Sequence, residues 1–428
     1  MDPKHLIDAL NAPTADERLA ALRALKELHD KGELPAPAEG KYVNNHIHTT
    51  YSFSPYSPTK AIYMAWINGL VTAGIMDHDS VAGAEEFIEA GKIVGVVTTV
   101  ALECRISFAA TQFNGRRLNN PDQITVAYAG LHGIPHQNIG KVQAFMAPLR
   151  EKRNDRNRKM IANLNRILEG TGIVLDFDAD VIPLSEAKNG GVVTERHLLF
   201  ALSKKIIAKT GMGQPLVDFL KESFGITPSA KNTAFLMDAE NPFAAYDLLG
   251  VLKSSLVEQF YIEADEECAP VDEFLALAKE VGAISAYAYL GDVTDSVTGD
   301  KKAQKFEDEF LDELVADLAE RGFNSITFIP TRNTLEQAAR LHDLCVKHNL
   351  FEISGEDINS PRQPFKNDII FTDEFKRLIT ATWALIGHEI AGTKNIEDNM
   401  FAEKAKKEYP SMPDRVQYYY NIGKNESI

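Results

Sequence analysis

The stretch that decides the fold of this chain begins with Val43-Asn44-Asn45-His46-Ile47-His48-Thr49-Thr50-Tyr51-Ser52. It continues to Gly74-Ile75-Met76-Asp77-His78-Asp79-Ser80 and closes at Val100-Ala101-Leu102-Glu103. Side chains alternate along a strand with a period of two, so His46 and His48 point to the same side. Two imidazoles with a free nitrogen each can bind one divalent metal. We therefore expect a metal site at the end of the first strand, with further ligands supplied by the rest of the chain.

Strands and helices alternate on both sides of a long helical stretch. The pattern predicts strands over 70–76, 94–102, 124–129, 283–289, 325–329 and 351–354, and helices over 59–69, 81–91, 302–320 and 335–348. Such alternation indicates a parallel sheet with ligands at the strand ends. The fold class is therefore α/β, with four predicted parts: an N-terminal helical arm (1–40), a barrel (41–137 and 280–370), an inserted helical domain (138–279) and a C-terminal helical extension (371–428).

The composition fits a globular protein without a membrane span. The chain has 428 residues, of which 44% are hydrophobic, and we find no apolar run of eighteen or more residues. The residues Met1-Asp2-Pro3-Lys4-His5 contain no apolar stretch of the kind found in a signal peptide, so we expect a cytoplasmic protein. The three cysteines match no zinc or disulfide spacing, and we expect all three to be buried.

The net charge of -16 argues against general binding of nucleic acid, which requires a basic face. One run, residues 150–159, is basic in spite of the negative net charge. We interpret it as the solvated face of a helix rather than a polyanion site. We also expect five histidines to lie on helix surfaces, and His132 and His136 to have a structural role in a Gly/Pro loop. The five are His5, His29, His342, His348 and His388.

Four motifs in a fixed order carry a resemblance to a known family. They are His46-Ile47-His48, Asp77-His78-Asp79, Ala101-Leu102-Glu103 and Ser354-Gly355-Glu356-Asp357-Ile358-Asn359. Together they resemble the polymerase and histidinol phosphatase (PHP) family, and in particular its insertion-bearing, metal-dependent phosphoesterase-like branch. The resemblance implies a distorted (β/α)7 TIM-like barrel whose strand ends hold one to three divalent metals, most often for phosphoester hydrolysis.

The resemblance implies one complete metal site. The family's first metal is held by two histidines, a bridging glutamate and an aspartate, which here are His46, His48, Glu103 and Asp357. This ligand set suits zinc, iron or manganese without choosing among them. The other two sites lack ligands, because Phe53, Thr125, Tyr289 and Asn359 stand where the family places metal-binding residues. We therefore expect one metal per chain.

Candidate catalytic and substrate-binding residues follow from the same comparison. His78 becomes a candidate general acid or base, oriented by Asp77 or Asp79, although Asp77 could equally cap the next helix. The stretch Gly190 to His197 resembles a Gly-Arg-Pro-His-like segment of the same branch, which implies that Arg196 and His197 approach the metal from the insertion. Arg332 would approach from the barrel, and an arginine pair suits a phosphate or carboxylate. Tyr289 and Asn359 could donate hydrogen bonds into the pocket.

These observations predict a metal-dependent hydrolase of PHP-like fold acting on a small anionic metabolite through a metal-activated water, with phosphoester cleavage as the family default. A mononuclear site would equally suit hydrolysis or lyase chemistry on a non-phosphate substrate. A catalytically silent, metal-stabilised binding module is the alternative from another class, since loss of ligands is what decay produces. The sequence does not determine the oligomeric state.

Overall fold

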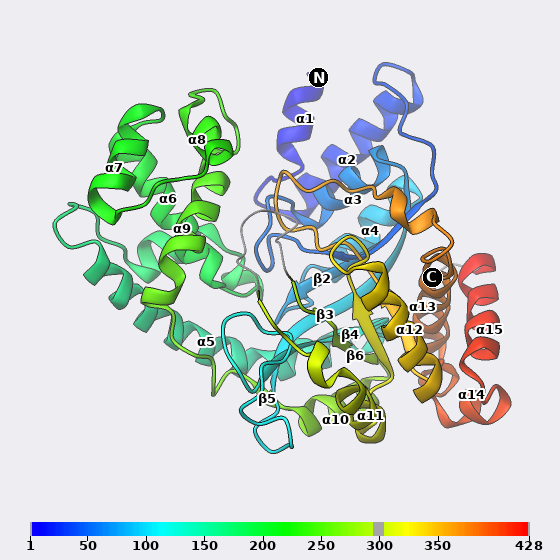
Figure 1. Cartoon of the computed structure of the whole chain (residues 1–428). Helices are drawn as coiled ribbons and strands as arrows, with labels where there is room; N and C mark the ends of the chain where they lie inside the picture. Colours follow the sequence, from blue (N-terminus) through cyan, green and yellow to red (C-terminus); the bar gives the residue numbers. More distant parts are fainter. Residues whose placement is uncertain (1, 294–303, 427–428) are drawn as a thin grey trace.

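The computed structural model describes residues 2–293 and 304–426. Its centre is a curled sheet of eight strands within these residues, flanked by helices on all sides (Figure 1). The strands are β1 (Tyr42–Ile47), β2 (Leu70–His78), β3 (Val97–Ser107), β4 (Val126–His132), β5 (Ala269–Pro270), β6 (Ile284–Ala288), β7 (Ser325–Phe328) and β8 (Phe351–Ser354). The mixed α/β class predicted from the sequence is confirmed.

The sheet is not uniformly parallel, and here the sequence prediction is wrong. The strand order is β1-β2-β3-β4-β6-β7-β8, with β5 paired to β3, and β4 runs antiparallel to both β3 and β6. An antiparallel neighbour needs only a loop to reach its place, whereas a parallel one needs a crossover, usually a helix. Residues 108–125, which connect β3 to β4, contain no helix. The predicted strand over 124–129 is found instead at Val126–His132.

The end of β8 lies beside β1 and draws the two edges of the sheet together. Ile47 forms a parallel bridge with Ile358, in which His48 N donates to Ile358 O and Ile358 N donates to His46 O. Asn45 Nδ2 donates to Ser354 O, which ties β1 to β8. These contacts place the segment after β8 next to His46 and His48. A complete (β/α)7 barrel remains a prediction.

Two N-terminal helices pack against the helices that follow β1 and β2. The four are α1 (Pro3–Ala9), α2 (Ala15–Asp30), α3 (Pro58–Ile67) and α4 (Ala84–Val94). Arg18 of α2 forms a buried ion pair with Glu86 of α4, and Glu86 also accepts from Thr59 of α3. Leucines of α1 and α2 belong to the same apolar core as β1 to β4. The predicted N-terminal helices are therefore part of the main core.

A second group of helices stands to one side of the sheet (Figure 1). It comprises α5 (Ile139–Ile167), α6 (Glu195–Thr210), α7 (Gln214–Phe224), α8 (Ala230–Met237) and α9 (Ala244–Phe260), with short turns at Phe177–Val181, Ile182–Leu184 and Ala187–Asn189. Apart from Phe53, the buried apolar cluster of this group consists of residues between Met160 and Phe260. The group thus has a core separate from that of the sheet, while the domain boundaries themselves remain predictions.

The basic run on α5 is not a solvated face, contrary to the sequence interpretation. Arg150, Arg153 and Arg156 are buried, while Lys152, Arg158 and Lys159 of the same run are exposed. Residues three apart lie close together on one side of a helix, so the run supplies two faces with opposite environments. The buried face points to the sheet and enters the candidate site described below.

The remaining helices lie below the sheet and to its right in the view of Figure 1. They are α10 (Val271–Val281), α11 (Leu311–Arg321), α12 (Leu335–His348), α13 (Arg377–Lys394), α14 (Glu403–Glu408) and α15 (Met412–Asn425), with short turns at His136–Asn138, Asp308–Phe310, Asp368–Phe371 and Ile396–Asp398. The helix predicted over 302–320 begins at Leu311, and residues 302–303 lie outside the described part.

Helix α13 is buried over most of its length, and His388 on it is wholly buried rather than on a helix surface. His388 Nδ1 accepts a hydrogen bond from Met400 N, which satisfies one of its ring nitrogens. All three cysteines are buried, as predicted. Within residues 2–293 and 304–426, no helix combines the length and the apolar character needed to cross a bilayer.

Candidate metal and anion site

His46, His48 and Glu103 converge at one edge of the sheet. One ligand atom from each lies within 4.8 Å of the others, and the Nε2 atoms of the two histidines are 3.1 Å apart. His46 lies on strand β1 and His48 directly after its end, and the pairing of β2 with β3 places His78 opposite Glu103. Burial lowers the pKa of His46, which favours loss of its proton and so frees a ring lone pair for a metal. This donor set of two imidazoles and a carboxylate fits a divalent metal.

Asp357 joins this cluster from the segment after β8. Its Oδ1 lies 3.3 Å from His48 Nε2, and the bridge between Ile47 and Ile358 holds it there. Burial raises the pKa of Asp357, but the neighbouring imidazoles of His48 and His46 and the charge of Arg196 outweigh this and hold the pKa well below its usual range. Asp357 is therefore a carboxylate whose oxygen faces the histidines, as a metal ligand must be.

His78 lies against both Glu103 and His48. Its Nδ1 is 3.0 Å from Glu103 Oε2, and its ring centroid is 4.6 Å from that of His48. Burial raises the pKa of Glu103, but the charges of His78, His46 and His48 lower it to about 2, so Glu103 is ionised. With Nδ1 directed at Glu103, the Nε2 of His78 is the nitrogen left for a substrate or a proton.

Asp77 is buried behind the cluster and does not line the cavity. Its carboxylate accepts from Thr49 N and Thr49 Oγ1 and, at 2.5 Å, from Ser52 Oγ. Ser52 donates its only hydroxyl hydrogen to Asp77. Its Oγ therefore acts as the acceptor for His48 Nδ1, which lies 3.2 Å away. The chain Asp77–Ser52–His48 therefore fixes the tautomer that leaves the Nε2 lone pair of His48 facing the cluster. This arrangement acts on His48, whereas the predicted partner was His78.

Replacing Ser52 by alanine is expected to weaken metal binding about tenfold to a hundredfold, because His48 loses the acceptor that holds its tautomer and ring orientation. Metal dissociation constants from chelator competition measure the effect. Ser54→Ala is the matched control, since Ser54 lies in the same loop and its Oγ accepts only from Tyr56 N. Equal affinities for the two variants would show that the relay does not orient His48.

A cavity opens from the cluster toward the helical group. Four of the predicted ligand and catalytic residues line it, namely His46, His78, Glu103 and Asp357, together with three of the predicted substrate-binding residues, Arg196, Tyr289 and Asn359. Asn359 connects two of them, because its Nδ2 donates to Asp357 Oδ1 at 2.6 Å and its Oδ1 accepts from Arg196 Nη1 at 2.6 Å. Tyr289 donates its hydroxyl hydrogen to Asp308 Oδ1.

Three other predicted residues are not among those that line the cavity. Arg332 donates to Leu290 O and lies over the ring of Phe306. His197 is buried, and its Nδ1 accepts from Thr194 N at the start of α6. Thr125 bonds to Asn114 and Gly115 in the loop before β4. The substrate role of Arg332 and the catalytic role of His197 remain predictions.

Phe53 and His132 are both buried near the site. Phe53 packs against His197, Phe200 and Tyr246 and so joins the loop after β1 to the helical group. His132 ends β4 and is buried, and neither ring nitrogen has a hydrogen-bond partner in the described part of the chain. Burial, with the charge of His46, lowers the pKa of His132 to about 3, so it is neutral. His132 is thus part of the sheet interior rather than of a loop.

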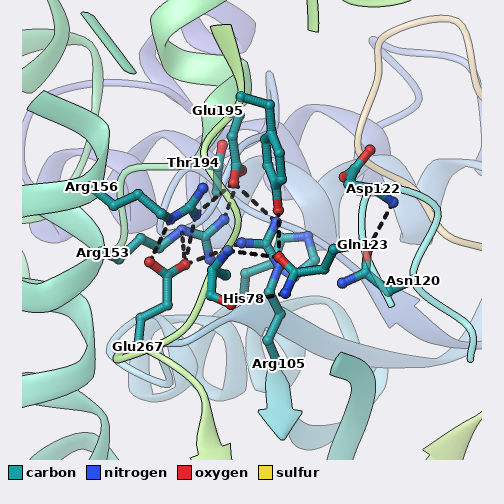
Figure 2. Close-up of polar contacts among 12 residues, drawn as sticks. His78, Arg105, Asn120, Asp122, Gln123, Arg153, Arg156, Thr194, Glu195 and Glu267 are labelled. Carbon is teal, nitrogen blue, oxygen red and sulfur yellow. Dashed lines mark hydrogen bonds and ion pairs between the residues drawn. The ribbon is translucent and has the colours of Figure 1, made fainter. Parts of the chain in front are cut away.

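The sequence analysis missed an ion cluster on the wall of the cavity, which we call the arginine cluster (Figure 2). Its members are Arg105 of β3, Arg153 and Arg156 of α5, Glu195 of α6, Glu267 before β5, and Asp79 after β2. Arg105 donates to Glu195 at 3.0 Å and to Glu267 at 3.1 Å. The three-residue spacing of arginines along 150–156 was the one sequence signal for it.

Charges balance within the arginine cluster, since three guanidinium groups meet three carboxylates. Arg196, the next residue after Glu195, differs in this respect. It lines the cavity and bonds to the neutral Asn359, and within residues 2–293 and 304–426 it forms no ion pair with a carboxylate. The arginine cluster therefore positions the start of α6, and Arg196 offers its charge to the cavity.

Two solved structures are similar in fold to this chain. A Bifidobacterium adolescentis protein, provisionally assigned as a metal-dependent phosphoesterase, has a TM-score of 0.51 and 19% identity, covering 81% of this chain and 97% of its own. An amidohydrolase from Chromobacterium violaceum, with sulfate bound and no metal, has a TM-score of 0.50 and 17% identity, covering 76% of this chain and 89% of its own.

Sequence comparison adds one curated relative. A 5'-3' exoribonuclease of Haemophilus influenzae is 27% identical over 157 residues, which is 37% of this chain and 48% of that protein. The chain thus matches about half the length of this relative. No protein-family model matches the chain. The class that fold and site define is therefore an α/β protein similar in fold to one protein assigned as a metal-dependent phosphoesterase and to one amidohydrolase, with a buried His46/His48/Glu103 cluster that fits a divalent metal.

Proposed function

We propose that the protein is a metal-dependent phosphoesterase of PHP-like barrel fold that acts on a small anionic metabolite. One observation carries the proposal: a single cavity is lined both by the ligand cluster of His46, Glu103 and Asp357 and by Arg196, which forms no ion pair within the described residues and whose Nη1 donates to the neutral Asn359. Guanidinium groups bind phosphate bidentately, so the substrate anion and the metal ligands share one space.

His46, His48, Glu103 and Asp357 would hold one zinc, iron or manganese ion. When bound, such an ion supplies an activated water near neutral pH. Arg196 binds the phosphoryl oxygens, and Asn359 orients Arg196 through the bond to its Nη1. His78 exchanges a proton through Nε2, because Glu103 occupies its Nδ1. Tyr289 contributes a wall of the cavity, since Asp308 already accepts its hydroxyl hydrogen.

Features of the similar proteins support this proposal. The Bifidobacterium protein carries a phosphoesterase assignment, and the Chromobacterium amidohydrolase binds sulfate, an oxyanion with the shape of phosphate. The exoribonuclease name concerns RNA, while the charge of -16 on this chain favours a small substrate over a polynucleotide. Chemistry on a non-phosphate substrate and a silent binding module are the competing proposals, and a cytoplasmic location remains part of the proposal.

Metal content and a substrate panel test the proposed function together. Protein purified without added metal is expected to contain about one equivalent of a divalent metal, because four protein ligands form one site. It is expected to hydrolyse phosphomonoesters but not carboxyl esters or amides. His78→Ala should lower kcat about a hundredfold if His78 moves a proton. Hydrolysis of esters or amides alone favours the non-phosphate proposal, and metal binding without any turnover favours the binding module.

A further inference from the structure

Tyr128 lies in the cavity beside the candidate metal ligands, on the antiparallel strand β4. It pairs with Arg105 in the β3–β4 ladder, in which Glu103 pairs with Gly130, and both Tyr128 and Arg105 line the cavity. Its ring centroid is 5.9 Å from that of His78. Two strand positions span about 6.6 Å, so Tyr128 lies about that far along the sheet from Glu103, at the same cavity.

The hydroxyl hydrogen of Tyr128 is not used in a hydrogen bond within the described residues. Arg105 Nε lies 3.2 Å from Tyr128 Oη, and because a guanidinium only donates, the phenol oxygen accepts. In residues 2–293 and 304–426, no acceptor lies within hydrogen-bond distance of the phenol hydrogen. Tyr261, which lines the same cavity, differs because it donates its hydrogen to Gln123 Oε1.

Arg105 holds the phenol of Tyr128 in position. The other two nitrogens of Arg105 donate to Glu195 and Glu267, so the guanidinium that binds Tyr128 Oη has no freedom to follow a ligand. Burial raises the pKa of Tyr128 to about 12, although the charge of Arg105 opposes this, and the phenol is therefore neutral and keeps its hydrogen near pH 7. A fixed, neutral donor aimed at a cavity is an element suited to binding an oxyanion.

We propose that Tyr128 is a further substrate-binding and catalytic residue, which donates its hydroxyl hydrogen to an oxygen of the phosphate bound in the cavity that Arg196 also lines. The inference rests on the proposed phosphoesterase function. No proton is transferred in this contact; the hydrogen bond strengthens as charge develops on the phosphoryl oxygens. Three groups then surround the anion: the metal ligands, Arg196 and Tyr128.

The test compares Tyr128→Phe with wild type in two measurements on the metal-loaded protein. One is the dissociation constant for inorganic phosphate by calorimetry, and the other is kcat for a phosphomonoester that the wild type hydrolyses. Loss of one oriented donor is expected to weaken phosphate binding about tenfold and to lower kcat about tenfold to a hundredfold. Tyr42→Phe is the control, since Tyr42 donates its hydroxyl to Asp368 away from the cavity. It should leave both values unchanged.

Each outcome decides one proposal. If wild type hydrolyses the ester and Tyr128→Phe matches it in both measurements, Tyr128 is not a phosphate donor and the inference is overturned while the function stands. If wild type binds phosphate tightly, loses that affinity in Tyr128→Phe and hydrolyses no phosphoester, the inference stands and the phosphoesterase function falls. If wild type neither binds phosphate nor turns over, both fall. Thermal unfolding of each variant establishes that it is folded.

Discussion

Replacing His46 by alanine is expected to remove the metal and to lower phosphoesterase activity about a thousandfold. His46 is buried and its Nε2 lies 3.1 Å from that of His48, so the variant loses one of two imidazoles facing the same point. The activity lost corresponds to ~4 kcal/mol of transition-state stabilisation, within the several kcal/mol that a metal supplies. Elemental analysis and initial rates on the same preparation measure the metal content and the activity.

A matched histidine separates the loss of a ligand from the loss of any imidazole. His342 lies on α12 and pairs with Glu352 by way of Nδ1, far from the cavity-lining residues. His342→Ala should keep about one equivalent of metal and full activity. If His46→Ala also retained its metal, the ligand assignment would be wrong, and if it lost the metal but kept its activity, catalysis would not depend on this site.

Replacing Glu195 by alanine is expected to destabilise the protein by about 3–5 kcal/mol, because it leaves buried guanidinium groups without a partner. Glu195 accepts from Arg105, Arg153 and Arg156, whose side chains are 4%, 5% and 7% exposed. These contacts also fix the first turn of α6, on which Arg196 lies. We therefore expect a higher KM for a phosphoester as well. Chemical denaturation measures the stability, and steady-state kinetics measure KM.

An exposed glutamate in the same helical group provides the comparison. Glu222→Ala on α7 removes a carboxylate from the surface and should change stability by less than about 0.5 kcal/mol. A similarly small change for Glu195→Ala would show that the arginine cluster does not hold the helical group to the sheet.

The ion pairs of Glu195 also predict that the free energy of unfolding depends on pH. Burial raises the pKa of this carboxyl, but Arg105, Arg153 and Arg156 outweigh it and hold the pKa well below 4.5. A group whose pKa is lower in the folded state than in the unfolded state stabilises the fold above its unfolded pKa. The stabilisation by Glu195 should therefore be complete above about pH 4.5 and decline as the pH falls toward the lower folded value. Glu195→Ala should lose less stability than wild type over that acid range.

Much of the sheet followed from the sequence because strand signals are local. The period-two placement of His46 and His48 and the apolar runs over 70–76 and 94–102 predicted three strands, and β1, β2 and β3 lie side by side. The direction of β4 could not be read in this way, because strand propensity is the same for a parallel and an antiparallel neighbour. Residues 108–125 decide it, because they form a loop without the helix that a parallel crossover usually needs.

The buried arginines of α5 show a second limit of prediction from the sequence. The spacing of Arg150, Arg153 and Arg156 indicates a shared helix face but not whether that face meets water. Charged residues are almost never fully buried unless they are paired, so the usual expectation is exposure. Glu195 and Glu267 are the ion-pair partners that allow these arginines to be buried. They lie 39 and 111 residues from Arg156 along the chain. No local pattern connects residues so far apart.

The sequence by itself therefore determined the α/β class and the pairing of His46 with His48, because both depend on the period of a strand and the order of apolar and polar residues along it. Only the tertiary structure decided which charges remain available in the cavity. Glu195 and Arg196 are neighbours in the chain, yet Glu195 turns to three arginines while Arg196 reaches Asn359 beside the metal ligands. The physical reason is that the balance of a buried charge depends on every element packed around it.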